Sequence, residues 1–148
     1  MAGTADGRRK VVWRVILAGI AVFLAAQLVP YGWWHENPPV VAPAVWPDAQ
    51  SEGLARAACY DCHSNETRWP LYSYVAPMSW LVRRDVETGR DELNFSDWDG
   101  GDADDAIDAI VEGEMPPTRY TLIHRDASLS PEETAAVVEA LAVMEAAD

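Results

Sequence analysis

The chain has 148 residues, with 24 acidic against 11 basic side chains, and a formal net charge of −13. This length suits one ordinary domain with an additional segment. The negative charge argues against a nucleic-acid partner, because such binding neutralises phosphates with Lys and Arg. The two cysteines can form at most one disulfide, which excludes a scaffold held together by disulfides.

The first 30 residues combine a basic start with a long apolar run. Residues 11–29 are apolar except at Arg14, Gly19 and Gln27. A helix of this length spans about 28 Å, close to the hydrocarbon thickness of a bilayer. We therefore expect residues 1–30 to form a cytoplasmic tip and a single transmembrane anchor, with the rest of the chain on the periplasmic, extracytoplasmic side of the cell membrane. The alternative is a cleaved signal peptide, although no small-x-small cleavage site follows this run closely.

Residues 31–47 are predicted to form a Pro-rich linker. Pro38, Pro39, Pro43 and Pro47 disfavour a continuous helix and favour an extended chain. Such a segment could act as a stiff spacer, or it could pack along the domain as an ordered strap. The sequence leaves both alternatives open.

The remaining part of the chain is predicted to be a small, mostly α-helical domain with irregular loops. No stretch alternates between apolar and polar residues for long enough to predict a sheet strand. Helical periodicity and cap residues predict several helices instead. The domain spans residues 48–148, and its predicted helices lie at 48–59, 79–88, 102–112 and from 131 onward.

Cap residues set the expected limits of these helices. Gly89 is expected to end the second one, and either Asp102 or Asp104 to cap the third. The last helix has the best-defined start, because Ser130 and Glu133 have the spacing of a capping box around a proline at the first helical position.

The motif that carries the chemistry is Cys59-Tyr60-Asp61-Cys62-His63. Cys-x-x-Cys-His is the attachment signature of c-type haem, in which two thiols add to the haem vinyl groups and the histidine ligates the iron. A redox Cys-x-x-Cys pair would need a thioredoxin-like βαβ pattern around it, and none is present. A zinc site would need a second Cys or His pair, which the chain does not offer. We therefore predict one covalently attached haem c, bound by Cys59, Cys62 and His63.

The second axial ligand of the iron has two main candidates. Met115 lies in Gly113-Glu114-Met115-Pro116-Pro117, where the prolines stiffen the loop that presents the thioether. A Met ligand raises the haem potential and suits electron transfer. His124 is the alternative distal ligand, and core packing is the alternative role of Met115. Among the weaker candidates, Met78 is expected to pack at the haem edge or in the core, Met144 in the core, and His35 to lie at the membrane interface.

These motifs resemble a known family, the bacterial haem-binding domain proteins, which are small membrane-anchored chains usually described as c-type cytochromes. The likeness begins at Asn37-Pro38-Pro39, includes the run from Cys59 to Pro70, and continues through the Met115 motif to His124 and Leu129-Ser130. It covers about residues 37–140. The chain departs from the family at Arg125, where a proline is common, and it lacks a Trp near the end of the last helix. The resemblance implies covalent haem and an exported location.

The leading hypothesis is a membrane-anchored monohaem c-type cytochrome that carries single electrons between redox partners outside the cytoplasmic membrane. Its partners would be redox proteins, with a membrane respiratory complex as one option, and it would have no enzymatic activity of its own. The alternative is a haem enzyme, or a gas or peroxide sensor, in which the sixth iron position is open or labile. His124 is the one distal acid–base group that the sequence supplies for such an enzyme. Because of this residue, peroxidase-like activity stays open.

Overall fold

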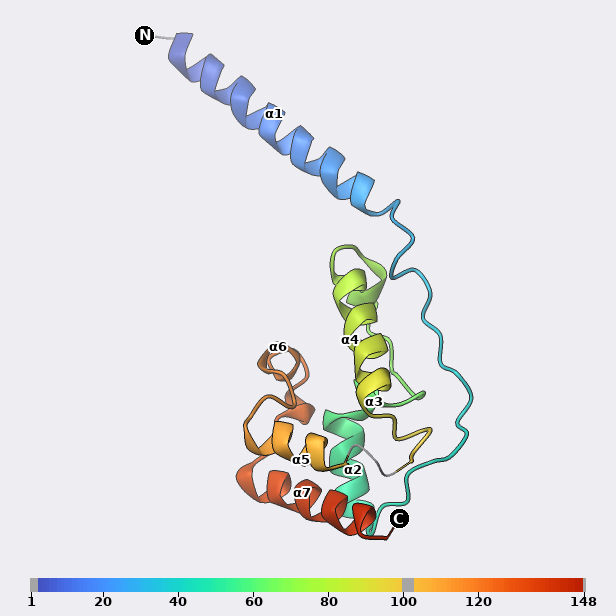
Figure 1. Cartoon of the computed structure of the whole chain (residues 1–148). Helices are drawn as coiled ribbons and strands as arrows, with labels where there is room; N and C mark the ends of the chain where they lie inside the picture. Colours follow the sequence, from blue (N-terminus) through green and yellow to red (C-terminus); the bar gives the residue numbers. More distant parts are fainter. Residues whose placement is uncertain (1–2, 100–102, 148) are drawn as a thin grey trace. The chain divides into compact units, whose positions relative to one another are not determined.

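The computed structural model describes residues 3–99 and 103–147. Within these ranges the chain is mostly α-helical and has no β-strand; Ala42 and Asp97 form one isolated bridge. The prediction of a mostly α fold is confirmed at this level. The helices, drawn in Figure 1, are α1 (Gly3–Ala26), α2 (Ala49–Ala58), α3 (Tyr60–His63), α4 (Met78–Glu92), α5 (Ala103–Val111), α6 (Thr118–Thr121) and α7 (Pro131–Glu145), with 3₁₀ turns at Leu71–Tyr74 and Arg125–Ala127.

Contacts divide the chain into two compact units. Unit 1 comprises residues up to His35 together with Pro70–Arg83, and unit 2 comprises Glu36–Trp69 together with the chain from Arg84 onward. The Cys-x-x-Cys-His motif, Met115 and His124 all belong to unit 2. The division of the sequence at residues 30 and 47 into anchor, linker and haem domain stays a prediction.

The predicted transmembrane anchor is wrong. Among the residues that the structure describes, no helix is long and apolar enough to cross a membrane. Helix α1 ends at Ala26, so its apolar part runs only from Val11 to Ala26. This part spans about 24 Å, short of the roughly 30 Å hydrocarbon core, and it contains Arg14. The described residues therefore do not support a single-pass membrane topology. The predicted periplasmic location of residues 48–148 depended on that topology and is not supported either.

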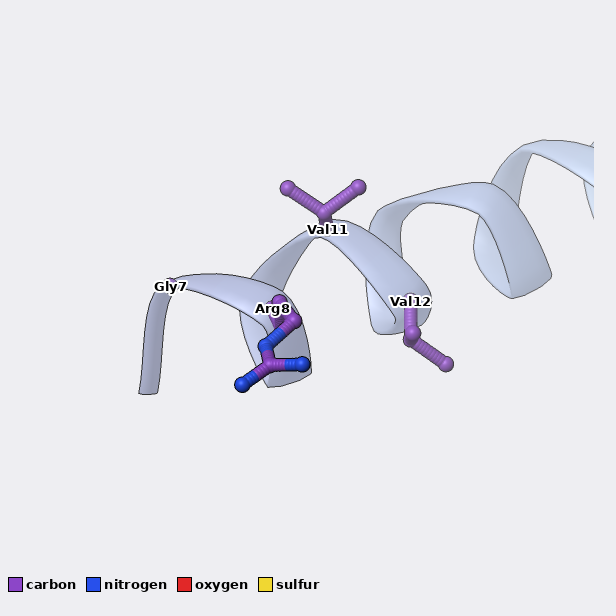
Figure 2. Close-up of a pocket in the computed structure, with 4 residues that line it drawn as sticks. All are labelled: Gly7, Arg8, Val11 and Val12. Atoms are coloured by element: carbon purple, nitrogen blue, oxygen red, sulfur yellow. The ribbon is translucent and has the colours of Figure 1, made fainter. Parts of the chain in front are cut away.

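An open hollow lies on the first turns of α1. It is lined by Gly7, Arg8, Val11 and Val12, and Figure 2 shows these residues on neighbouring turns of one helix. Both valines are more than half exposed, at 58% and 56%. The hollow contains no Cys, His or Met, so it offers no ligand to a haem iron.

Unit 1 is held together by polar and aromatic contacts. The Gln27 amide exchanges two hydrogen bonds with the backbone of Ala76, at 3.0 and 3.1 Å. His35 Nε2 lies 2.9 Å from Ser73 Oγ and its ring packs on Tyr74, with 4.0 Å between the centroids. His35 is therefore engaged by Ser73 and Tyr74, and the interfacial role expected for it depended on the membrane anchor, for which the described residues offer no helix.

Unit 2 has its core around α7, which packs against both α2 and α5 (Figure 1). Helix α7 contributes an inner stripe, and aromatic side chains close the other side of the core. Tyr60 stacks on Phe95 at 5.1 Å, and Phe95 in turn stacks on Trp98 at 5.8 Å. The buried members of this core cluster are Trp46, Ala55, Tyr60, Phe95, Val137, Ala140, Leu141 and Met144.

The helix starts follow local cap chemistry. Asp48 caps α2 by accepting from the backbone of Gln50 and Ser51, and Ser130 forms the predicted capping box with Glu133 at the start of α7. The expected stop at Gly89 is wrong, because α4 continues to Glu92. Asp102, one of two expected caps for α5, lies outside the described residues.

Residues 36–47 run along unit 2 as an ordered strap. The backbone of Ala42 and Ala44 pairs with Ser96 and Phe95, with N–H to O distances of 3.1 and 2.9 Å, and the Pro39 carbonyl accepts from the Asn65 amide at 2.9 Å. These bonds replace the hydrogen bonds that an extended Pro-rich chain cannot make within itself. Of the two alternatives for this stretch, the ordered strap agrees with the structure.

Candidate haem-binding site

The Cys-x-x-Cys-His motif forms one tight turn at the junction of α2 and α3. Cys59 ends α2 and begins α3, and its carbonyl accepts from the backbone N–H of Cys62 at 3.1 Å and of His63 at 2.9 Å. Residues three apart on such a turn lie on the same side, so the two thiols face a common region. Neither cysteine is in a disulfide, and both are partly exposed.

The two thiols are electrostatically unlike those of a redox pair. Burial raises the pKa of Cys59 to about 12, and burial together with the nearby carboxylates of Asp85 and Asp61 raises the pKa of Cys62 to about 12. Redox-active Cys-x-x-Cys motifs have a lowered thiol pKa instead. The described residues also contain no group of three His, Cys, Asp or Glu side chains that could hold a metal ion. The environment therefore disfavours both the dithiol and the zinc interpretation.

His63 is fixed through both its backbone and its ring. Its carbonyl accepts from the Phe95 N–H at 2.8 Å, and its Nδ1 lies 3.2 Å from the Leu93 carbonyl oxygen, to which it can donate. Burial lowers the pKa of His63, which keeps the imidazole neutral. A proton held on Nδ1 leaves the lone pair of Nε2 for a metal, the arrangement that orients ligating histidines in general.

The two residues between the cysteines anchor the turn on opposite sides. Tyr60 is 4% exposed, stacks in the aromatic core and accepts a hydrogen bond from Trp46 Nε1 at 3.0 Å. Asp61 is 8% exposed and accepts from the backbone and side chain of Arg68 and from the Tyr120 hydroxyl, the last at 2.9 Å. The Cys-x-x-Cys-His signature does not specify either position, so the motif alone carries no signal for these two roles.

Helix α4 approaches the turn closely at Gly89. A Cβ added there would lie 2.7 Å from the carbonyl oxygen of Cys62 and 3.1 Å from its Cβ, closer than atoms pack. Gly89 therefore lies inside α4, at the point where this helix contacts Cys62. Glycine is required here for close packing and does not mark a helix end. Only a residue without a side chain lets α4 lie this close to the turn Cys59–His63, the candidate site of haem attachment, which we call the haem-attachment turn.

Met115 follows α5 in a loop that is tied back to the helix. Gly113 adopts φ +78°, and the backbone N–H groups of Glu114 and Met115 both donate to the Ala109 carbonyl, at 2.9 and 3.1 Å. The Met115 side chain is 39% exposed. Within the described residues no hydrogen bond or ring contact joins Met115 to His63, so its role as a ligand stays a prediction.

His124, the alternative ligand, is connected to the haem-attachment turn through a neighbour. Its ring stacks on Tyr120, with 4.3 Å between the centroids, and the Tyr120 hydroxyl reaches Asp61 inside the motif. Sequence reasoning missed Asp61 and Tyr120, which lie 59 positions apart. Met78 and Met144 lie elsewhere: Met144 is buried in the core and Met78 begins α4.

Together, the residues of the turn fit a haem group. Two free thiols on one side of a tight turn and a histidine with its Nδ1 engaged form a donor set that fits haem attachment. The fold and this donor set define a small helical haem protein.

Comparison with known proteins also indicates a haem-binding domain. The model of the haem-binding domain family matches residues 21–142, and the chain belongs to this family. It is also similar to the cytochrome c peroxidase Ccp of Escherichia coli (strain K12), with 29% identity over an alignment of 138 residues, and the match covers 82% of this chain. The chain spans only 30% of the length of that relative. No solved structure matches significantly.

Proposed function

We propose that the protein is a monohaem c-type cytochrome that carries single electrons between redox partners. In this proposal Cys59 and Cys62 bind the haem covalently through thioether bonds, and His63 ligates the iron through Nε2. The observation that carries the proposal is the engagement of His63 Nδ1 with the Leu93 carbonyl at 3.2 Å, on a turn that also presents both thiols. This contact selects the tautomer and ring orientation that iron ligation needs.

A haem bound here supplies one-electron chemistry between ferric and ferrous iron. The chain contributes rigidity to this chemistry. Tyr60 anchors the turn in the aromatic core, Gly89 lets α4 pack directly against it, and the Leu93 carbonyl holds the His63 ring. A ligand that is fixed from several sides moves little when the charge on the iron changes, which favours rapid electron transfer.

The sixth position is assigned to Met115, with His124 as the alternative. Met115 is presented by a loop that is tied to the end of α5 and stiffened by two following prolines. The partly exposed thioether of Met115 is available to ligate the iron, whereas Met144 is buried in the core. A Met ligand would raise the potential and close the iron to other molecules.

The partners proposed are redox proteins with a basic docking surface, a respiratory complex among them. The net charge of −13 would speed encounter with such a surface, and the rate would fall as salt is added. Effective contact with the partner does not require a large interface, because electron-transfer encounters are among the smallest known.

A second candidate function is a peroxidase or sensor with an open sixth position. It is favoured by the similarity to a protein named cytochrome c peroxidase. The chain covers 30% of that protein, so the similarity applies to one part of a larger enzyme and fits an electron-carrying segment as well as a catalytic one. We therefore place this candidate second.

The test is to produce the full chain in a host that matures c-type cytochromes and to measure two properties. A pyridine haemochrome assay with haem staining of the denatured protein reports covalent attachment, and the spectrum of the reduced protein with and without carbon monoxide reports the sixth position. Covalent haem with no shift on adding carbon monoxide supports the electron carrier. A clear shift favours the second candidate, and the absence of covalent haem overturns both.

A further inference from the structure

The segment from Thr118 to His124, which we call the distal segment, is connected to the haem-attachment turn by side chains. It contains α6 and follows the Met115 loop. The Tyr120 hydroxyl donates to Asp61 Oδ2 at 2.9 Å, and Arg119 Nη2 lies 3.0 Å from Asp85 Oδ1 on α4. The segment thus lies against both the turn and the helix that packs on it.

The distal segment contacts two carboxylates, Asp61 and Asp85, and Asp61 is the less exposed to solvent. It is 8% exposed and also accepts from the Arg68 backbone at 3.0 Å and from Arg68 Nε at 3.2 Å, so its carboxylate is fully engaged. Burial and the neighbouring Asp61 raise the pKa of Tyr120, which keeps its hydroxyl a donor. The Arg119–Asp85 pair has exposed fractions of 58% and 29%, and exposed ion pairs contribute little. The hydrogen bond from Tyr120 is therefore the stronger attachment.

The rest of the distal segment depends on Tyr120. The His124 ring stacks on Tyr120, and the His124 N–H donates to the Tyr120 carbonyl at 2.9 Å. Between them, Leu122 and Ile123 are 64% and 57% exposed, so they contribute little packing of their own. A segment of this kind opens more readily when a buried polar attachment such as the Tyr120–Asp61 bond is lost.

We propose that Asp61 and Tyr120 are positioning residues that hold the distal segment against the haem-attachment turn and so limit the access of water to the haem. This inference rests on the proposed function, because it assumes that haem is attached at Cys59 and Cys62. Asp61 occupies one of the two positions of the motif that the attachment chemistry leaves free. It links that turn to a segment 59 positions later in the chain.

The test uses the full, haem-loaded chain and compares variants that differ by few atoms. Tyr120→Phe keeps the ring that stacks on His124 and removes only the hydroxyl. Asp61→Ala removes the acceptor, and Asp61→Asn retains an acceptor oxygen without the charge. Tyr74→Phe is the matched control, because Tyr74 is 59% exposed in unit 1 and its ring also packs on a histidine, His35.

Two measurements report on the proposal. Hydrogen exchange at the amides of residues 118–124 reports opening of the segment, and the reduction potential with the visible spectrum reports the surroundings of the haem. We expect exchange to be about tenfold faster or more in Tyr120→Phe and Asp61→Ala, as the loss of one charge-assisted hydrogen bond predicts. In Tyr120→Phe, which keeps the charge of Asp61, we also expect a lower potential, because water stabilises the more highly charged ferric state. Asp61→Ala also removes a negative charge near the haem, which raises the potential, so its exchange rate alone is compared. Asp61→Asn should speed exchange less than Asp61→Ala.

The double variant Asp61→Ala/Tyr120→Phe should open the segment no further than Asp61→Ala alone, because Asp61→Ala already removes the bond that Tyr120→Phe removes, together with the Arg68 bonds. Exchange in Tyr120→Phe that equals that of Tyr74→Phe would overturn the proposal. Faster exchange with an unchanged potential and spectrum would overturn it too, because the bond would then stabilise the segment without affecting the haem. A wild-type chain without covalent haem would overturn the proposed function as well, and this outcome is seen before any variant is compared.

Discussion

Replacing Gly89 with Ala tests whether close packing of α4 builds the haem-attachment turn. The added Cβ would lie 2.7 Å from the carbonyl oxygen and 3.0 Å from the carbonyl carbon of Cys62. These are backbone atoms, which cannot rotate away as a side-chain end could. Either α4 or the turn must move, and the turn carries both thiols and His63.

The expected magnitude follows from two opposing effects. Ala in a helix interior is favoured over Gly by about 0.5–1 kcal/mol. An added methyl in a filled site costs about 1–3 kcal/mol. The matched control is Gly53→Ala in α2, where nothing lies within 4 Å of the added Cβ, so that only the favourable effect operates. The two variants should therefore differ in free energy of unfolding by about 1–3 kcal/mol, with Gly53→Ala the more stable.

Thermal unfolding of the haem-loaded protein, followed by circular dichroism, measures this difference. For a chain of this size about 2–4 °C corresponds to each kcal/mol, so the two melting temperatures should separate by several degrees. The covalent haem content per chain should fall in Gly89→Ala and stay unchanged in Gly53→Ala. Equal stability and equal haem content of the two variants would refute the reasoning.

Three further predictions concern the haem ligands and a helix cap. Met115→Ala should open the iron, so that the reduced spectrum shifts on adding carbon monoxide while that of His124→Ala does not; the reverse pattern would assign the site to His124. Cys59→Ser and Cys62→Ser should each leave a single thioether, seen as a shifted pyridine haemochrome band, and two unshifted bands would contradict covalent attachment at these positions. The backbone and side chain of Ser51 lower the pKa of Asp48, so its cap should stabilise the protein above the ordinary carboxyl pKa and lose this effect as the pH falls. Asp48→Asn should cap α2 without this acid dependence, and parallel pH profiles of unfolding for the two proteins would refute the assignment.

The parts of the fold that the sequence predicts well depend on neighbouring residues. The capping box of α7 needs only Ser130 and Glu133, and the turn of the Cys-x-x-Cys-His motif spans only five consecutive residues. These interactions form within one or two helical turns, so the spacing of residue types is enough to indicate them. The mostly helical class follows for the same reason.

The parts that the sequence does not predict depend on contacts between distant segments. Gly89 looks like a helix stop until the approach of Cys62 is known, and the bond between Asp61 and Tyr120 joins positions 59 apart. The predicted anchor failed for another reason. Its apolar run continues to Val29, but the helix ends at Ala26, and hydropathy alone does not reveal where a helix ends.

The guanidinium of Arg90 has a consequence for the electrostatic potential around the haem-attachment turn. It donates to the carbonyls of Ser64 and Glu36 and to the side chains of Asn37 and Thr67, at 2.8 to 3.0 Å, and all four acceptors are uncharged. This positive charge is therefore held half-buried without a carboxylate in its hydrogen-bond shell, and it lowers the pKa of Cys62 against the stronger effect of burial. Arg90 therefore offsets part of the negative field that Asp85 and Asp61 create at the turn, so a partner attracted by the acidic surface would meet a weaker negative field beside Cys62.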